Sequence, residues 1–280
     1  MTRRTADATG PLNKFWISVA LCLCAVFAAF EHGEANASDV SGASLLAAAG
    51  YDQPFSNIEA DVRLQLIESR SGLSEEVVVY AAQPFNGVAL TAGIAADVEA
   101  ALPEDTRRAV IAFFASPLGA KFSAMGKQHH DFLRSIDGEG NAKIMNEGGN
   151  LIKENERGPL YRELHFNSGK QSIDDRLLWA TSHALIAAEG KLDDAEGPEA
   201  IDAVLKAEFP QDLLDLVREF DLPSFAYGYR DASMEDLEAF RGFLASKEGA
   251  AFVAATQDAV DKRLDDASAQ LLKRLKEKKS

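Results

Sequence analysis

Four histidines beyond residue 37 are the side chains best suited to holding a metal ion: His129, His130, His165 and His183. His129 and His130 are adjacent, and adjacent side chains on a helix point about 100° apart, so they cannot chelate one ion as an i, i+4 pair does. His129 also lies seven residues after Phe122, on the same face of a predicted helix. We therefore expect His129 to be partly buried and hydrogen-bonded, and the spacing of the four histidines predicts no metal site.

Segment 137–141, Asp-Gly-Glu-Gly-Asn, has the composition of a calcium-binding loop. In an EF-hand that begins at Asp137, however, Ala142 takes the place of the turn glycine and Gly148 that of the closing glutamate. We therefore predict that this segment is an exposed, flexible boundary and not a calcium site.

Patterns typical of catalysis are missing from the sequence. It contains neither the Gly-x-Ser-x-Gly of a nucleophilic serine nor a Gly-x-x-x-x-Gly-Lys phosphate loop. Acidic residues are paired at Asp174-Asp175, Asp193-Asp194 and Asp265-Asp266, but in a chain with 44 acidic residues such pairs usually lie on solvated helix faces. We expect no catalytic residue and no cofactor.

Phe225, Tyr227 and Tyr229 alternate along the chain beside Pro223 and Gly228. A spacing of two does not place side chains on one face of a helix, so the pattern favours an extended or irregular segment. Filling of the core is the default expectation for three such rings, and this is the one stretch that we nominate as a binding surface.

The elements that carry these residues are predicted to be helices. Prolines that are followed by acidic or capping residues mark helix starts, because the first turn does not need the missing N–H, and they occur at Pro103, Pro117, Pro198 and Pro210. The single β-branched run, 77–79, follows Ser74-Glu75-Glu76, which is typical of a capped helix start. We therefore predict an all-α fold.

One motif occurs twice. Residues 113–122, Phe-Phe-Ala-Ser-Pro-Leu-Gly-Ala-Lys-Phe, return 130 residues later as Phe-Leu-Ala-Ser-Lys-Glu-Gly-Ala-Ala-Phe at 243–252. Each copy predicts a break between two helices, with Ser116 or Ser246 as N-cap and with Gly119 or Gly249 close to another backbone. The repeat predicts two similar helical units, 41–136 and 172–280, separated by a Gly-rich boundary and connecting segment at 137–171.

An aromatic-rich helix that ends in Ser-Pro-x-Gly-x-Lys resembles the helical periplasmic family known as domain of unknown function 2059. Residues 113–121 are the better match, whereas the second copy has Lys247 in place of the proline and Ala251 in place of the lysine. The resemblance implies an all-helical envelope protein. It brings no catalytic residues to this chain.

Residues 1–37 are predicted to be a signal peptide. The basic residues at its start are Arg3, Arg4 and Lys14. The uncharged run 15–30 is shorter than the roughly twenty residues of a membrane span. Ala35-Asn36-Ala37 matches the small-x-small cleavage pattern, so cleavage between Ala37 and Ser38 and export to the periplasm are expected, with an uncleaved anchor as the alternative.

The net charge of −15 excludes some partners. Residues 1–37 hold equal numbers of acidic and basic residues, so the mature chain keeps this charge and repels nucleic acid and anionic lipid. Both cysteines, Cys22 and Cys24, lie in the signal peptide, so the mature chain has no disulfide. The basic C-terminal tail, 273–279, is expected to complement a helix dipole.

We predict a non-catalytic, exported protein that binds a protein or another envelope component and keeps no membrane span after cleavage. The sequence does not decide between a monomer and a homo-oligomer. An apolar stripe runs through Val260, Leu264, Leu271 and Leu275 and is expected to cover the core of its own domain. Little chain is left to pack over Leu271 and Leu275, so a partner helix or a second copy of the protein over that part is the alternative. The alternative is a periplasmic hydrolase or metal-dependent enzyme whose site is assembled from distant residues such as His129 and His165.

Overall fold

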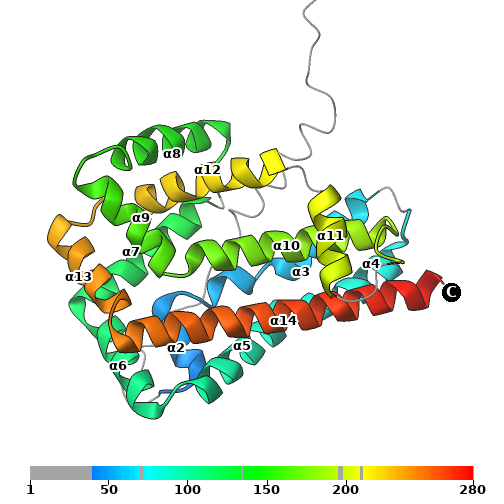
Figure 1. The fold of residues 1–280 in the computed structure, drawn as a ribbon, viewed down its shortest axis with the longest axis horizontal. Helices are drawn as coiled ribbons and strands as arrows, with labels where there is room; N and C mark the ends of the chain where they lie inside the picture. Colours follow the sequence, from blue (N-terminus) through cyan, green and yellow to red (C-terminus); the bar gives the residue numbers. More distant parts are fainter. Residues whose placement is uncertain (1–39, 70–71, 134, 195–197, 209–210, 280) are drawn as a thin grey trace, which may run out of the picture.

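The computed structural model describes residues 40–69, 72–133, 135–194, 198–208 and 211–279, and these residues form an all-helical fold without a strand (Figure 1). The predicted signal peptide and its cleavage site at Ala37 lie outside the described residues. The predicted fold class, all-α, is confirmed.

The helices up to residue 133 are α2 (Gly42–Ala49), the 3-10 turn η1 (Gln53–Phe55), α3 (Ile58–Glu68), α4 (Glu75–Ala82), η2 (Gln83–Phe85), α5 (Gly87–Ala101), α6 (Glu104–Ala115) and α7 (Pro117–Leu133). The later helices are α8 (Gly138–Leu151), α9 (Arg157–Asn167), α10 (Lys170–Ala188), α11 (Pro198–Glu208), α12 (Gln211–Gly228), α13 (Met234–Leu244) and α14 (Lys247–Lys279). Helices begin at or directly after the four prolines that the sequence marked. Ser74 accepts a hydrogen bond from the Val77 amide and so caps α4, as predicted.

The longest helix, α14, runs along the molecule and packs against α10, α5, α6 and α4 (Figure 1). Its apolar stripe is fully covered, since Leu264, Leu271 and Leu275 are at most 1% exposed. The expectation that the stripe covers the core of its own fold is confirmed, and the alternative, that its C-terminal part faces a partner, is wrong. Helix α4, almost 200 residues earlier in the chain, covers it.

The basic end of α14 is docked onto the same region. Arg274 donates hydrogen bonds to the Tyr80 carbonyl and to Gln83, at 2.6 and 2.8 Å, and its guanidinium lies over the Tyr80 ring. Lys278 pairs with Glu76. The tail thus contributes to intramolecular packing.

Both predicted helix breaks are present. Helix α6 ends at Ala115 and α7 begins at Pro117 after a bend of 74°, while α13 ends at Leu244 and α14 begins at Lys247. At each corner the serine hydroxyl donates to the preceding phenylalanine carbonyl at 2.6 Å and accepts from the following glycine amide, at 3.2 Å for Ser116 and 3.0 Å for Ser246. The serine therefore satisfies groups on both sides of the bend.

The corner glycines leave no room for a side chain. A Cβ on Gly119 would lie 2.2 Å from the Phe113 carbonyl oxygen, and one on Gly249 would lie 2.1 Å from that of Phe243. The two corners also touch each other, because the Phe113 and Phe243 rings stack in parallel with their centroids 3.6 Å apart. Close backbone approach explains why the glycine recurs at both sites.

Segment 137–149, the Gly-rich start of the boundary predicted at 137–171, is not a flexible loop. Asp137 accepts hydrogen bonds from the amides of Glu139 and Gly140 and so caps α8, which packs on α12 (Figure 1). Gly148 lies against Pro223 of α12, where a Cβ would come within 2.0 Å of a carbonyl oxygen. Tertiary packing therefore holds a glycine-rich sequence in a helix.

By length and composition, one helical stretch of the described chain, Glu75–Ala101, is apolar enough to cross a membrane, and the bent pair of α6 and α7 would make a second. Core helices of folded proteins meet the same criteria. In this stretch Ile94 and Val98 are fully buried, and Asp97 pairs with Arg263 of α14.

Candidate functional site

A partly enclosed cavity of about 90 Å³ lies where α2, α7, α10, α12 and the α13–α14 corner meet. Its apolar wall is aromatic and comes from Phe114, Phe122, Phe225, Phe240 and Phe252. The ionisable side chains of its wall are Tyr51, Lys127, His129, His130, Lys170, Asp174 and Tyr229. An apolar cavity with a few polar groups from different elements is typical of a small-molecule site.

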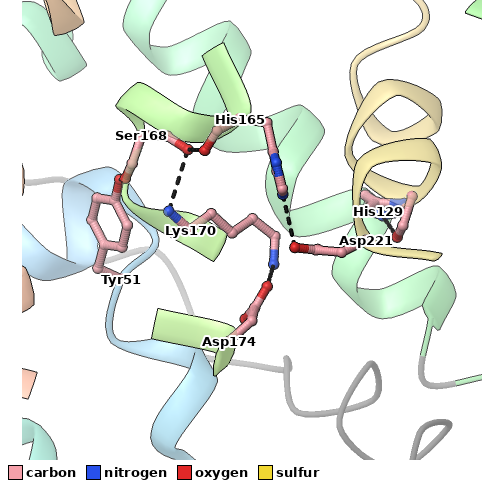
Figure 2. Close-up of polar contacts among 8 residues, drawn as sticks. Tyr51, His129, His165, Ser168, Lys170, Asp174 and Asp221 are labelled. Carbon is pink, nitrogen blue, oxygen red and sulfur yellow. Dashed lines mark hydrogen bonds and ion pairs between the residues drawn. The ribbon is translucent and has the colours of Figure 1, made fainter. Parts of the chain in front are cut away.

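Two left-handed glycines turn the chain at this cavity. Gly50, with φ of 74°, ends α2, and Gly169, with φ of 70°, lies between α9 and α10. These turns bring Tyr51 and Ser168 together, so that the Tyr51 hydroxyl donates a hydrogen bond to the Ser168 carbonyl (Figure 2). A contact between residues 117 positions apart thereby closes one side of the cavity.

A cluster of charged groups lies beside the turn at Gly169 (Figure 2). The Lys170 ammonium binds the Asp174 carboxylate one helical turn later at 2.5 Å, and His165 Nε2 lies 2.8 Å from Asp221. Figure 2 shows the Asp221 carboxylate between His165 and the end of the Lys170 side chain. Helices α9, α10 and α12 are thus joined by paired charges.

Burial and pairing shift the pKa values of the two carboxyl groups in opposite directions. Burial raises the pKa of Asp174 to about 6, although the Lys170 charge opposes the shift. Burial alone would also raise the pKa of Asp221, but the His165 hydrogen bond and the Lys170 charge outweigh it and hold that pKa below its usual range. Asp174 therefore exchanges its proton near neutral pH.

His129 is buried and lies 2.9 Å, through Nε2, from the Ser224 hydroxyl, as the expected hydrogen-bonded histidine does. Burial, together with the charges of Lys170 and Arg230, lowers its pKa to about 3, so the ring is neutral at pH 7. Its Nδ1 makes no hydrogen bond to the described residues. Ser224 is 5% exposed and does not line the cavity, which differs from the open nucleophile of a serine hydrolase.

The nominated aromatic residues do not form an extended segment or an open surface. Phe225 and Tyr227 lie in α12 and are 2% and 3% exposed, and Tyr229 follows the end of the helix. Phe225 and Tyr229 share one side and line the cavity, whereas Tyr227 packs with Leu133 and Ile144. Phe225 and Tyr229 are four residues apart, and this spacing places two side chains on the same face of a helix.

The most polar part of the site was missed at the sequence level. Asp174 belongs to a pair that was assigned to a solvated face, and Lys170, Asp221 and Tyr51 were not singled out. The only local signal is Lys170 four residues before Asp174 at the start of a helix. The remaining contacts join helices that are far apart in the sequence.

The histidines do not converge on one point. His183 stacks on Trp179, with centroids 5.2 Å apart, and burial lowers its pKa to about 4, but it does not line the cavity. Among the described residues no group of three His, Asp or Glu side chains is placed to hold a metal ion. Comparisons of the chain with protein families, with curated proteins and with solved structures found no match.

Proposed function

We propose that this chain is an exported binding protein that holds a small component of the cell envelope in the aromatic cavity and carries out no catalysis. The observation that carries the proposal is the cavity itself, in which phenylalanine side chains of five helices face a few ionisable groups. Such a lining buries the apolar part of a ligand and orients its polar part.

The pairing of the polar groups supports binding over catalysis. His165 is bound to Asp221, Lys170 to Asp174, and the Tyr51 hydroxyl to a backbone carbonyl. A group that transfers a proton or attacks a substrate needs an available proton or lone pair within reach of it. Paired groups instead fix the position of the cavity wall.

The proposal includes a duplicated architecture, with α2–α7 and α9–α14 as two copies of one six-helix unit. Equivalent pairs support it: α2 packs on α6 as α9 packs on α13, and α3 packs on α4 as α10 packs on α11. The corners at Ser116 and Ser246 share their hydrogen bonds, and Gly50 and Gly169 share their left-handed turn. The cavity then lies at the junction of the units, where ligand sites are common.

Export and family membership are parts of the same proposal. The signal peptide at 1–37 supports a periplasmic location, and the motif at 113–121 supports kinship with domain of unknown function 2059. Both agree with an all-helical envelope protein without cysteines in its mature part. Determining the intact mass of the protein recovered from periplasm tests the first, since the expected chain begins at Ser38.

The cavity proposal is tested by filling the cavity. A Cβ on Gly126 would lie 3.2 Å from the Tyr229 hydroxyl, so the side chain of Gly126→Leu occupies the cavity. Gly242→Leu is the matched control, because that glycine is exposed on α13 with open space around it. Native mass spectrometry after incubation with an envelope extract should detect a bound small molecule on the wild type and on Gly242→Leu. Equal occupancy of Gly126→Leu, or no bound molecule on the wild type, would contradict the proposal.

A second candidate is the hydrolase, which one observation favours. Asp174 lines the cavity with a pKa near 6, within the range of a general acid or base at neutral pH. If the cavity hydrolyses its ligand, Asp174→Asn should abolish turnover of the extracted molecule but leave binding intact. If the protein only binds its ligand, the molecule is recovered unchanged from both the wild type and Asp174→Asn.

A further inference from the structure

The charge of the cavity wall is opposite to that of the chain. The whole sequence carries a net charge of −15, yet the wall contains two lysines, Lys127 and Lys170, against one aspartate, Asp174. With His129 neutral, the wall is therefore cationic in an acidic protein. A cationic patch inside a low-dielectric pocket selects ligands by the sign of their charge.

Lys127 is the second lysine of the cavity wall. Elsewhere lysines near the junction pair with carboxylates, as Lys121 does with Asp236 at 2.6 Å and Lys262 with Asp97 at 2.9 Å. Lys127 forms no hydrogen bond or ion pair with any described residue. Burial raises the pKa of Asp52, and the charge of Lys127 is one of the effects that oppose the rise.

The size of the cavity limits the ligand. A volume of about 90 Å³ is smaller than the roughly 150 Å³ of an engineered apolar cavity that accepts benzene. A ligand that lies wholly inside is therefore smaller than benzene. A carboxylate with two or three carbon atoms fits the space.

We infer that the ligand of this cavity is a short-chain carboxylate, with its carboxylate on Lys127 and its apolar carbons against Phe122 and Phe225. The inference rests on the proposed function and adds the ligand's charge and size. A charged hydrogen bond formed away from water is stronger than one on the surface, so one lysine suffices for selection.

The inference is tested with propionate as probe, compared with propionamide, propylammonium and benzoate. These four separate charge from shape, since the first three have nearly the same volume. Ligand-observed NMR on the full mature chain should give a millimolar or tighter Kd for propionate, weaker binding for propionamide and no binding for the other two.

Two variants and one control test whether Lys127 and the cavity itself are needed for binding. Lys127→Gln should raise the Kd for propionate about tenfold, because it removes a charge-assisted hydrogen bond. Lys153→Gln is the matched control, since Lys153 is exposed and does not line the cavity, and its Kd should equal that of the wild type. Gly126→Leu should abolish binding of every probe.

The outcomes separate this inference from the function on which it rests. If propionamide binds as tightly as propionate, or if Lys127→Gln leaves the Kd unchanged, the choice of an anion is overturned. Should no probe bind while an envelope molecule still binds in a Gly126-dependent way, the cavity is a binding site for a different ligand class. Absence of both kinds of binding overturns the inference and the proposed function together.

Discussion

The helix corners at Ser116 and Ser246 and the charged cluster around Lys170 are both junctions between helices, but different forces hold them. At the corners, glycines let backbones meet and the Phe113 and Phe243 rings stack. In the cluster, helices α9, α10 and α12 are joined by Lys170, Asp174, Asp221 and His165. Packing depends on shape alone, whereas the cluster depends on which groups carry protons.

The cavity is lined by residues of both regions. Phe114, Leu244 and Phe252 enter it from the corner helices, while Lys170 and Asp174 enter it from the cluster. The corner side therefore keeps its form over a wide range of conditions. The cluster side responds to pH, and a ligand meets both.

The largest effect is expected at the corner glycines. Gly119→Ala and Gly249→Ala each place a Cβ about 2 Å from a carbonyl oxygen, so the helix has to move, and we expect a loss of about 3 kcal/mol or more in the free energy of unfolding. Gly242→Ala, where the space is open, should instead stabilise the protein by up to about 1 kcal/mol. Urea denaturation measures all three. Wild-type stability in either corner variant would refute the close-approach account.

The next effect concerns the stacked rings. Phe113→Ala and Phe243→Ala should each cost about 2–3 kcal/mol, since both side chains are only partly buried, and the double variant should reveal a coupling of about 1 kcal/mol. These losses should be the same at pH 5 and pH 8, because no proton is involved. A loss that changes with pH would mean that the two regions are not independent.

A smaller effect is expected from Asp174. Its pKa is raised to about 6, so the folded state binds the proton more tightly than the unfolded state, and stability falls as pH rises from about 4 to 6. Asp174→Asn removes this dependence, and its stability relative to the wild type should rise by roughly 2 kcal/mol across that interval. Chemical denaturation at several pH values gives the profile. Parallel curves for the two proteins would show that the raised pKa is not present in solution.

The smallest effect is expected where a surface ion pair crosses the junction. Lys121 of α7 binds Asp236 of α13, and both side chains are partly exposed. Lys121→Gln should lower stability by about 0.5 kcal/mol, and the difference should disappear in 1 M salt. A loss comparable with that of Phe113→Ala would mean that charge, and not shape, holds the corners together.

Local rules account for what was predicted from the sequence. Proline and serine at helix starts, the two corners and the burial of His129 follow from hydrogen-bonding needs within a few residues. Segment 137–149 was mispredicted because its helix depends on Gly148 lying against Pro223, a contact across 75 residues. The covering of Leu271 by α4 and the meeting of Tyr51 with Ser168 are equally non-local, and composition does not specify which helices meet.

Helix α14 has a consequence for the order of folding. It packs on α4, α5 and α6, so these three helices lack one of their partners until residues 247–279 have been made. Contacts of such long sequence separation slow folding, because a long loop must close before they form. The sides of these helices that face α14 are uncovered until then, and uncovered apolar surface is what chaperones bind.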